Sequence, residues 1–359
     1  MPPTRRLGYS PYEQLEDRPH VIVDGAARRS SVLTLSHWPH SPSPAVFAHD
    51  LSCGIVLAFL SYQSGRQVSG RLERAAVVAA LTAFREAEAV TNDHFDEDGL
   101  MSVFAMMEPQ IALSRQQLLR AVACCGDFGV VSSRQAAAVS FAIGPLADLE
   151  AGSGAGTSER YLALLPRTED LLSRPEDYEA LWGAEMRLFE EGEAALARGE
   201  VEITLCPDDL AIVRRVGDHA TRLPGAAGAL PVHAAAVHSA TSASRILCFD
   251  GPRCELYLRY ESWVRYVSRR LPLRPALAPL AAELSSLEPG SISWEANEPS
   301  AIVARLRPGG EGCSDLGADV IAERVSRYLA AAPPAWDPFA QSGGGERRRR
   351  RGAGRRPRR

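Results

Sequence analysis

Residues 87–104 read AEAVTNDHFDEDGLMSVF and pass from one apolar run, through a polar segment, into a second apolar run. The first run, residues 87–91, predicts a short β-strand, and the second, residues 100–107, predicts a helix. Six polar side chains lie between the two runs, where the strand ends. Because α/β folds build their sites at the carboxyl ends of strands, this stretch predicts both an α/β fold and the position of a site.

Strands and helices alternate on both sides of this stretch. Apolar runs predict two further strands, over residues 20–24 and 31–35. Helical patterns follow over residues 51–60, 74–85, 110–123 and 132–146. The alternation predicts a layered α/β domain with a mostly parallel sheet over residues 19–150, preceded by an N-terminal arm over residues 1–18.

The remaining chain divides into three predicted segments. Residues 151–200 form an acidic helical segment with two helices that separate near Pro175. Residues 201–340 predict a second, α+β domain. Its expected strands are 201–205, 210–216, 246–250, 255–260, 291–294 and 301–306, and its expected helices are 275–287 and 318–331. Residues 341–359 are a Gly/Arg-rich tail that we expect to be disordered.

The polar segment has the side chains of a metal site. Asp96 and Asp98 are two residues apart, so both carboxylates can face one pocket if the backbone there is extended. Gly99 allows a tight turn and the close approach of another group. The N–H groups at the start of the following helix favour an anion such as phosphate. Carboxylate oxygens suit Mg²⁺ or Mn²⁺, and His94 shifts the preference towards Mn²⁺.

Two other interpretations of this segment were weighed. An EF-hand loop with Gly99 at its sixth position would have His94 first and Ala105 twelfth, and neither is the required ligand. The acids could instead only cap the following helix and solvate a loop.

Further ligands are expected from other strand ends and loops. Asp127 lies between two glycines, His37 follows the strand predicted over residues 31–35, and Asp50 precedes a helix. The predicted metal ligands are therefore Asp96, Asp98, Asp127, Asp50 and His37. We assign catalytic roles to His37, His94 and Asp98. Arg259, His233 and His238 are candidates for substrate binding, although structural roles in a domain core are equally open to them.

Three segments resemble motifs of the DHH phosphoesterase superfamily over residues 20–145. Residues 91–104 are similar to its first motif, residues 36–60 to its Asp-His-His segment, and Gly126-Asp127 to its intermediate aspartate motif. The order of the motifs is permuted here. Ser36, Trp38 and Asn92 stand where the family has Asp, His and His. These departures leave a one-metal site and a degenerate, non-catalytic site open beside the two-metal site that the ligand set suggests.

A second resemblance covers nearly the whole body of the chain. Residues 32–39, 92–104 and 259–264 resemble a bacterial domain-of-unknown-function family. The resemblance implies that these three segments belong to one fold, and it implies no activity.

Charge is divided unevenly along the chain. All forty basic residues are arginines, which excludes P-loop, Schiff-base and protein-kinase chemistry because each needs a lysine. Residues 346–359 hold nine arginines and one glutamate, a net charge of +8, and the rest of the chain carries −12. The acidic body argues against a nucleic-acid binder, while the tail predicts non-specific contact with anions or nucleic acid.

The chain has the composition of a soluble protein. No apolar run approaches the roughly 18 residues that cross a bilayer, and residues 1–18 are too polar for a signal peptide. The seven cysteines lack the spacing of a disulfide framework. We therefore expect a cytoplasmic protein with reduced thiols, and the sequence leaves its oligomeric state open.

Together these features predict a metal-dependent phosphoesterase that acts on a small phosphorylated substrate with Mn²⁺ or Mg²⁺ as cofactor. The alternative is a non-catalytic protein that binds a ligand or partner on a related fold. The two interpretations differ in whether the carboxylates of Asp96, Asp98 and Asp127 converge with a histidine.

Overall fold

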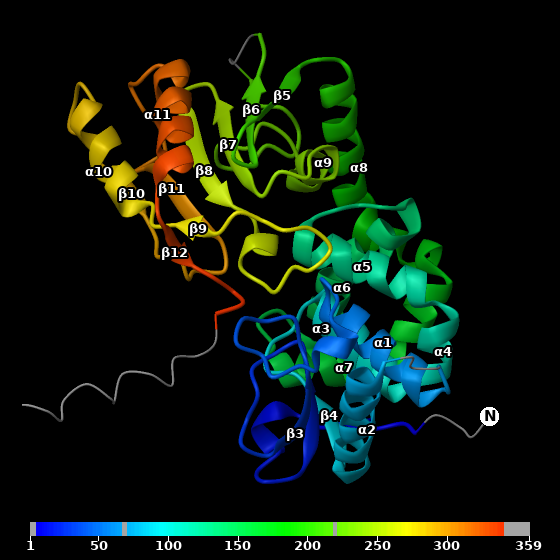
Figure 1. Ribbon diagram of the computed structural model, residues 1–359. Coiled ribbons are helices and arrows are strands. Elements are labelled where there is room, and N and C mark those ends of the chain that lie inside the picture. Colours follow the sequence, from blue (N-terminus) through cyan, green and yellow to red (C-terminus); the bar gives the residue numbers. More distant parts are fainter. Residues whose placement is uncertain (1–4, 67–69, 218–220, 341–359) are drawn as a thin grey trace, which may run out of the picture.

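The computed structural model describes residues 5–66, 70–217 and 221–340 (Figure 1). The chain forms two lobes, each with its own main sheet, and the first lobe lies at the bottom of Figure 1. The mixed α/β fold predicted from the sequence is confirmed. The tail at residues 341–359, for which we predicted disorder, lies outside the described residues.

The first lobe contains a four-stranded parallel sheet in the order β1-β4-β2-β3. Its strands are β1 (Gly8–Tyr9), β2 (His20–Val23), β3 (Ser31–Leu35) and β4 (Ala89–Thr91). Val21 pairs with both Leu33 and Val90, so β2, β3 and β4 end at the same edge of the sheet. Strand β1 comes from the predicted arm and was not foreseen, because two residues carry no periodic signal.

Helices cover this sheet and extend away from it. They are α1 (Ser52–Gln63), α2 (Arg71–Glu86), α3 (Glu97–Met107), α4 (Pro109–Ser114), α5 (Gln116–Phe128) and α6 (Arg134–Ala151). Helices α1, α3 and α5 contact one another, and they share a core in which Leu57, Leu100 and Met101 are fully buried. The start of α1 and the start of α3 are thereby brought together.

Helix α5 differs from the sequence-based expectation. The helical pattern predicted over residues 110–123 ends too early, because the helix continues through Gly126 and Asp127 to Phe128 and ends at Gly129 in the left-handed conformation, with φ +63°. Such a glycine is a common helix C-cap. Gly126 serves packing, because a Cβ there would lie 2.5 Å from Glu97 Cβ. Asp127 therefore projects from a regular helix.

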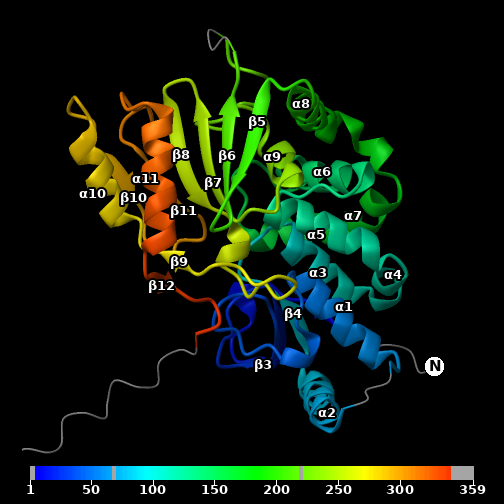
Figure 2. The same cartoon turned by 45° about the horizontal axis from the view of Figure 1, so that its top comes forward.

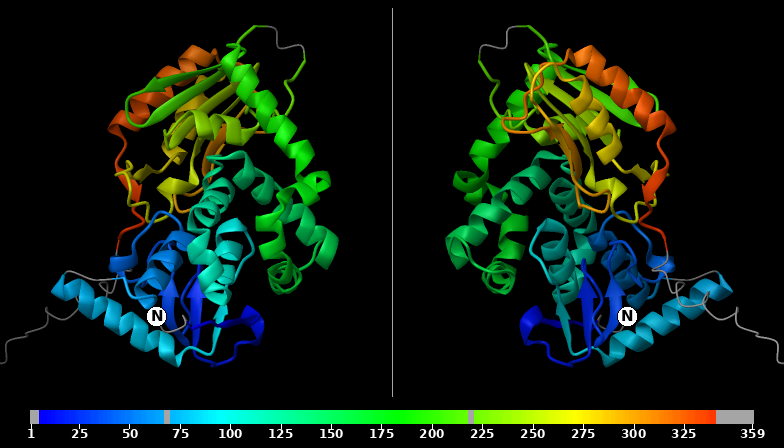
Figure 3. Two further views of the ribbon diagram at one scale, coloured as in Figure 1. Left: turned by 90° about the vertical axis from the view of Figure 1, so that its right-hand side faces the viewer. Right: turned by 90° about the vertical axis from the view of Figure 1, so that its left-hand side faces the viewer.

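The acidic segment forms the two helices that the sequence predicts. Helix α7 (Thr157–Ser173) and helix α8 (Glu179–Ala197) are separated at Pro175. Helix α8 packs against α6 in the first lobe and leads directly into the first strand of the second lobe. Figure 3 shows this long green helix connecting the two lobes.

The second lobe is built on a six-stranded mixed sheet in the order β10-β11-β8-β7-β6-β5 (Figure 2). Its strands are β5 (Val201–Cys206), β6 (Leu210–Arg215), β7 (Arg245–Asp250), β8 (Arg253–Leu258), β10 (Trp294–Ala296) and β11 (Ala304–Pro308). Only β6 and β7 pair in parallel. The helices are α9 (Ala234–Ala240), α10 (Ala278–Leu287) and α11 (Ala318–Ala331). The predicted second α+β unit is thus present.

Two segments of the second lobe return to the first lobe. Residues 259–273 follow β8, and within them Arg265 N donates to His37 O at 2.8 Å. The C-terminal segment pairs as β12 (Pro334–Trp336) with β9 (Arg274–Pro275), and His40 Nδ1 bonds to Ala340 O at 2.8 Å. The second lobe therefore lies against the residues that follow β3. No helix in the described ranges is long and apolar enough to cross a membrane.

Candidate metal centre

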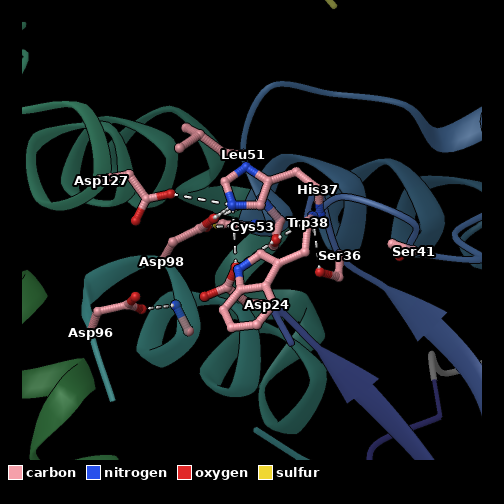
Figure 4. Close-up of polar contacts among 12 residues, drawn as sticks. Asp24, Ser36, His37, Trp38, Ser41, Leu51, Cys53, Asp96, Asp98 and Asp127 are labelled. Atoms are coloured by element: carbon pink, nitrogen blue, oxygen red, sulfur yellow. Dashed lines mark hydrogen bonds and ion pairs between the residues drawn. The ribbon is translucent and has the colours of Figure 1, made fainter. Parts of the chain in front are cut away.

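Acidic and histidine side chains meet where the parallel strands of the first lobe end (Figure 4). Asp24 directly follows β2, His37 follows β3, and the segment from Asn92 to Asp98 follows β4. Asp127 reaches the same place from α5. We call Asp24, His37, His94, Asp96, Asp98 and Asp127 the central cluster. Its position agrees with the expectation that sites lie at the carboxyl edge of a parallel sheet.

Asp24 occupies the middle of the central cluster. Its backbone is left-handed, with φ +46°, and its side chain is 1% exposed. Oδ1 accepts a hydrogen bond from Ser52 Oγ at 2.7 Å and lies 3.4 Å from His37 Nε2. Oδ2 lies 3.2 Å from His94 Nε2. The two oxygens thus point to two different histidines. The left-handed backbone of Asp24 is uncommon for a residue other than glycine, and such conformations occur often at functional sites.

The ring of His37 is fixed in one tautomer by the backbone. Nδ1 lies 2.5 Å from Asp50 O, a carbonyl that can only accept, so Nδ1 carries the proton. Nε2 therefore presents a lone pair to the cluster, 3.4 Å from Asp24 Oδ1, 3.5 Å from Asp127 Oδ2 and 3.9 Å from Asp98 Oδ2. A lone pair that faces three carboxylates is stable only with a cation or a proton between them.

Asp98 and Asp127 are buried on the far side of His37. Asp98 accepts backbone hydrogen bonds from Ser52 and Cys53, both at 2.7 Å, at the N-terminus of α1. The positive end of that helix stabilises its charge. Asp127 is equally buried, with its side chain 4% exposed, but its Oδ2 has no hydrogen-bond partner among the described residues.

His94 and Asp96 form the open side of the cluster, with side chains 29% and 31% exposed. His94 Nε2 lies 2.8 Å from Asp96 Oδ2, and Nδ1 lies 3.0 Å from Asp93 Oδ1. Asp96 also caps α3 by accepting from Gly99 N at 2.8 Å. This cap occupies an N–H group that we expected to bind phosphate. The close approach predicted at Gly99 is present, since a Cβ there would lie 2.3 Å from Asn92 Nδ2.

Two overlapping ligand sets share Asp24. The first contains Asp24, His94 and Asp96, and the second contains Asp24, His37 and Asp98. In each set, one potential ligand atom per residue lies within 4.8 Å of the others. Oxygen and imidazole ligands of this kind suit Mg²⁺ or Mn²⁺. The residues could therefore hold a divalent cation, and the carboxylate of Asp24 has one oxygen for each set.

The pKa values of the buried acids reflect their confinement. Burial, followed by the charge of Asp24, raises the pKa of Asp98 well above its usual value. Burial and the charge of Asp98 do the same to the pKa of Asp127, and burial with the charge of Asp96 raises the pKa of Asp24. Each carboxylate thus makes its neighbour harder to ionise, which a bound cation would reverse.

The two histidines are shifted in opposite directions. Burial lowers the pKa of His37 and outweighs the charge of Asp24, so the ring is neutral and can act as a ligand. Burial also opposes protonation of His94, but its hydrogen bonds to Asp24, Asp93 and Asp96 raise its pKa overall. Burial alone would raise the pKa of Asp96, yet the hydrogen bond from His94 lowers it. Without a cation, a proton on His94 neutralises this side of the cluster.

The structure brings together most of the residues that the sequence selects. Asp98 and Asp127 converge on His37, and Asp96 converges on His94. Asp50 does not join them, because its Oδ1 accepts from the backbone N–H groups of Val267 and Ser268 at 2.6 and 2.9 Å. The carboxylate of Asp50 therefore does not take the predicted role of a ligand. Instead, the backbone carbonyl of Asp50 orients the ring of His37.

The sequence-based selection missed Asp24. This residue ends the apolar run of residues 20–24, which is the same signal that selected Asp96 and Asp98 after β4. Gly25 then lets the chain pass close to the segment after β4, since a Cβ there would lie 2.7 Å from Asp93 Oδ1. An acid at a predicted strand end, followed by glycine, would have been sufficient to find it.

The residues predicted for substrate binding have other partners. Arg259 is 3% exposed, and its guanidinium donates to the carbonyls of Thr241 and Phe128 at 2.9 and 3.0 Å. His238 bonds to Phe128 O at 3.1 Å and to Tyr257 Oη at 2.9 Å. His233 pairs with Glu185 at 2.7 Å. Arg259 and His238 therefore fix the end of α5 next to Asp127, and none of the three side chains faces the central cluster.

The fold and the site together define a class, a two-lobed α/β protein with a buried carboxylate and histidine cluster at the carboxyl edge of a parallel sheet. The model of a family described as a family of unknown function (DUF6687) matches residues 5–339, and the chain belongs to this family. Searches of curated proteins and of solved structures return no match. The family carries no assigned activity, so the site itself must supply the argument for function.

Proposed function

We propose that this protein is a metal-dependent phosphoesterase whose central cluster binds two divalent cations. The observation that carries the proposal is the sharing of Asp24 between two ligand sets, each with its own histidine and a second aspartate. A carboxylate that bridges two cations is a common element of two-metal phosphoesterase sites. The two sets include five of the six residues of the central cluster, and Asp127 lies beside the second set, 3.5 Å from His37 Nε2.

Electrostatics support the presence of cations. Asp24, Asp98 and Asp127 have side chains that are at most 4% exposed, and no arginine of the described residues lies within ion-pair distance of them. Burying several like charges without a counter-ion costs several kcal/mol per charge. Two divalent cations would remove this cost. Protonation is the alternative for the metal-free protein, and it competes with metal binding at the same atoms.

The second contact of each histidine supports a ligand role. His37 donates Nδ1–H to a backbone carbonyl, and His94 has Asp93 on its Nδ1 side at 3.0 Å. Metal-ligating histidines are typically oriented in this way through the ring nitrogen that does not bind the metal. In both rings, the other nitrogen faces Asp24.

Chemistry follows from the ligand set. Cations held here would lower the pKa of a water molecule and hold the oxygens of a phosphoryl group. Asp24 would keep the two cations at a fixed separation, His37 and Asp98 would hold the buried one, and His94 and Asp96 would hold the one nearer to solvent. A substrate would approach from the side of His94 and Asp96, whose side chains are 29% and 31% exposed.

The choice of metal follows from the donors. A set of carboxylates with one imidazole per cation accepts both Mg²⁺ and Mn²⁺, and the imidazoles favour Mn²⁺ because its affinity for nitrogen is higher. We therefore expect Mn²⁺ to support higher activity than Mg²⁺.

The sequence resemblance adds independent support. The three segments that resemble DHH phosphoesterase motifs contribute His94, Asp96 and Asp98, then His37, and then Asp127 to one cluster. The three segments lie apart in the sequence and in a permuted order, and they nevertheless meet in one cluster, as motifs of one site would. The substitutions at Ser36, Trp38 and Asn92 leave all six residues of the central cluster in place.

Partners and location remain part of the proposal. A small phosphorylated substrate is the expected ligand, and the basic tail at residues 341–359 is expected to bind anions non-specifically. All seven cysteines are unpaired, which fits the reducing cytoplasm that the sequence favours.

The test is hydrolysis of bis(p-nitrophenyl) phosphate and p-nitrophenyl phosphate with Mn²⁺ by the wild type, Asp98→Asn and Asp319→Asn. Asp319 is the matched control, because it also lies in the first turn of a helix but is 92% exposed and pairs with Arg214. We expect Asp98→Asn to lower kcat by about 10³-fold, or about 4 kcal/mol in activation free energy, and Asp319→Asn to match the wild type. Equal rates for Asp98→Asn and wild type would contradict the proposal.

The alternative of a non-catalytic binding protein gives a different result. In that case the wild type would bind Mn²⁺, shown by a rise in melting temperature that EDTA reverses, but it would hydrolyse neither ester. The same three proteins therefore separate an enzyme from a metal-binding protein without activity.

A further inference from the structure

One residue of the second lobe reaches the central cluster. Tyr260 begins the short 3-10 helix η4 (Tyr260–Ser262) directly after β8, and its hydroxyl lies 3.3 Å from His37 Nε2. Its ring meets the His37 ring edge-on at 5.7 Å and stacks on Trp263 at 5.6 Å. Tyr260 therefore touches the same histidine nitrogen that faces Asp24, Asp98 and Asp127.

The position of Tyr260 is fixed by its neighbours. Arg259 precedes it and donates to Phe128 O at 3.0 Å, one residue after Asp127. The carbonyl of Tyr260 accepts from Trp263 N at 2.8 Å. The ring of Phe128 lies 6.0 Å from the ring of Tyr260. Because backbone and ring contacts hold it on both sides, the hydroxyl keeps its place when its own hydrogen bond changes.

The direction of the hydrogen bond to His37 can be assigned. Nδ1 of His37 carries the proton, because its partner is the carbonyl of Asp50. Nε2 is then an acceptor, so Tyr260 is the donor in the contact at 3.3 Å. In the metal-free protein, this hydroxyl is one donor to the lone pair of His37, and a proton on a neighbouring carboxyl group is the other.

Metal binding would change the partner of Tyr260. A cation bound to Nε2 would take up the lone pair that the hydroxyl uses, so Tyr260 would lose this acceptor. The hydroxyl then remains next to the centre as a neutral donor in a buried place, where an unsatisfied donor costs about 1–3 kcal/mol. An oxygen of a phosphoryl group bound at the centre is the acceptor that restores the bond.

We propose that Tyr260 is a catalytic residue that donates a hydrogen bond to a phosphoryl oxygen of the substrate. The inference rests on the proposed phosphoesterase function and assigns to the second lobe a part in the reaction. The hydroxyl stabilises the charge that grows on this oxygen in the transition state, and its proton stays on Tyr260, which forms and breaks no covalent bond. The contact of the second lobe with the first thus places Tyr260 beside the central cluster.

The experiment compares wild type, Tyr260→Phe and Tyr266→Phe. Tyr266 is the matched control, since it lies in the same returning segment and packs on Phe128 at 5.6 Å, but its hydroxyl bonds to Ser268. Three quantities are measured by calorimetry and kinetics. They are the affinity for Mn²⁺ alone, the affinity of the Mn²⁺-loaded protein for inorganic phosphate, and kcat for bis(p-nitrophenyl) phosphate.

For Tyr260→Phe we expect an unchanged affinity for Mn²⁺, about tenfold weaker binding of phosphate, and a kcat about 10²-fold lower, the size seen when one such donor is removed. Tyr266→Phe should match wild type in all three. The removal of one oxygen leaves the stacking on Trp263 in place, and the melting temperature checks that the variant folds.

The other outcomes overturn the inference in distinguishable ways. A loss of Mn²⁺ affinity in Tyr260→Phe that accounts for its loss of activity would make Tyr260 a support for His37 and nothing more. Wild-type kcat and wild-type phosphate affinity in Tyr260→Phe would remove its role while leaving the proposed function intact. A wild type that binds Mn²⁺ but hydrolyses no ester would remove both.

Discussion

Buried acids are treated differently in the two lobes. In the second lobe, three buried acids each pair with an arginine, Asp250 with Arg222, Glu255 with Arg305 and Glu261 with Arg259. A fourth, Glu288, accepts hydrogen bonds from the side chains of Trp294 and Ser314. In the first lobe, Asp24, Asp98 and Asp127 are equally buried, yet within the described ranges they face two histidines and one another and meet no arginine.

The difference separates structural charges from functional ones. An arginine partner supplies a fixed positive charge to each of these acids, which suits a core. In the first lobe, Asp24 Oδ2 and Asp127 Oδ2 have no hydrogen-bond partner among the described residues, and burial and neighbouring acids raise the pKa values of Asp24, Asp98 and Asp127. A group of this kind costs stability, so we attribute it to a ligand that supplies positive charge. Each prediction below tests one side of this contrast.

The largest expected effect is on activity. Asp24→Asn removes the residue shared by both ligand sets, so it should lower kcat for bis(p-nitrophenyl) phosphate by at least about 10³-fold, or about 4 kcal/mol. Asp96→Asn affects one set only, at a side chain that is 31% exposed, and should cost less. Greater activity in Asp24→Asn than in Asp96→Asn would contradict the central place of Asp24.

In the second lobe, a large loss of stability is expected when the buried Arg259 is replaced. Arg259→Leu leaves Glu261 without its cation and the carbonyl of Phe128 without a donor, so the free energy of unfolding should fall by about 3–5 kcal/mol. Urea denaturation measures it. Arg327→Leu is the control, because Arg327 and its partner Glu283 are 55% and 34% exposed and an exposed pair contributes about 1 kcal/mol or less. Equal losses would remove the distinction between buried and exposed arginine pairs.

In the first lobe, removing a buried acid is expected to raise the free energy of unfolding. Asp127→Asn removes one of the acids that repel each other, and burial and Asp98 raise the pKa of this carboxyl, so in EDTA the substitution should raise the free energy of unfolding. Asp250→Asn, which leaves arginines unpaired in the second lobe, should lower it. Destabilisation by both variants would show that the acids of the two lobes are alike.

The stabilisation by Asp127→Asn should also depend on pH. The folded pKa of Asp127 is raised by burial and by Asp98, so its ionisation destabilises the fold progressively as the pH rises above its unfolded value of about 3.9. At low pH the wild-type side chain is protonated and as neutral as asparagine. The difference in stability between the two proteins should therefore be larger at pH 8 than at pH 5, and a constant difference would contradict the raised pKa.

The sequence predicted the fold well where local patterns decide it. The strands β2, β3 and β4 and the helices α7 and α8 fall close to their expected positions, because apolar periodicity and Pro175 mark them. The end of α5 was misplaced because Gly126 was interpreted as a helix breaker. Its actual role, close packing against Glu97, depends on a contact between distant segments.

The site was predictable only in part. Five of the six residues of the central cluster were selected, since an acid or histidine after an apolar run is a local signal. Asp24 carries the same signal and was overlooked. Asp50 was selected wrongly as a ligand because its partners, Val267 and Ser268, lie more than two hundred positions away. Tyr260 could not be assigned to the site, because nothing in its own segment shows that it reaches His37.

The central claim is that Asp24 is shared by two cations. The most direct test is the stoichiometry of Mn²⁺ binding, measured by equilibrium dialysis on the wild type and on Asp24→Asn at neutral pH. The account predicts two Mn²⁺ ions per chain for the wild type and none held tightly by Asp24→Asn, whereas Asp319→Asn should bind two. Absence of tight Mn²⁺ binding in the wild type, or two ions in Asp24→Asn, would contradict it.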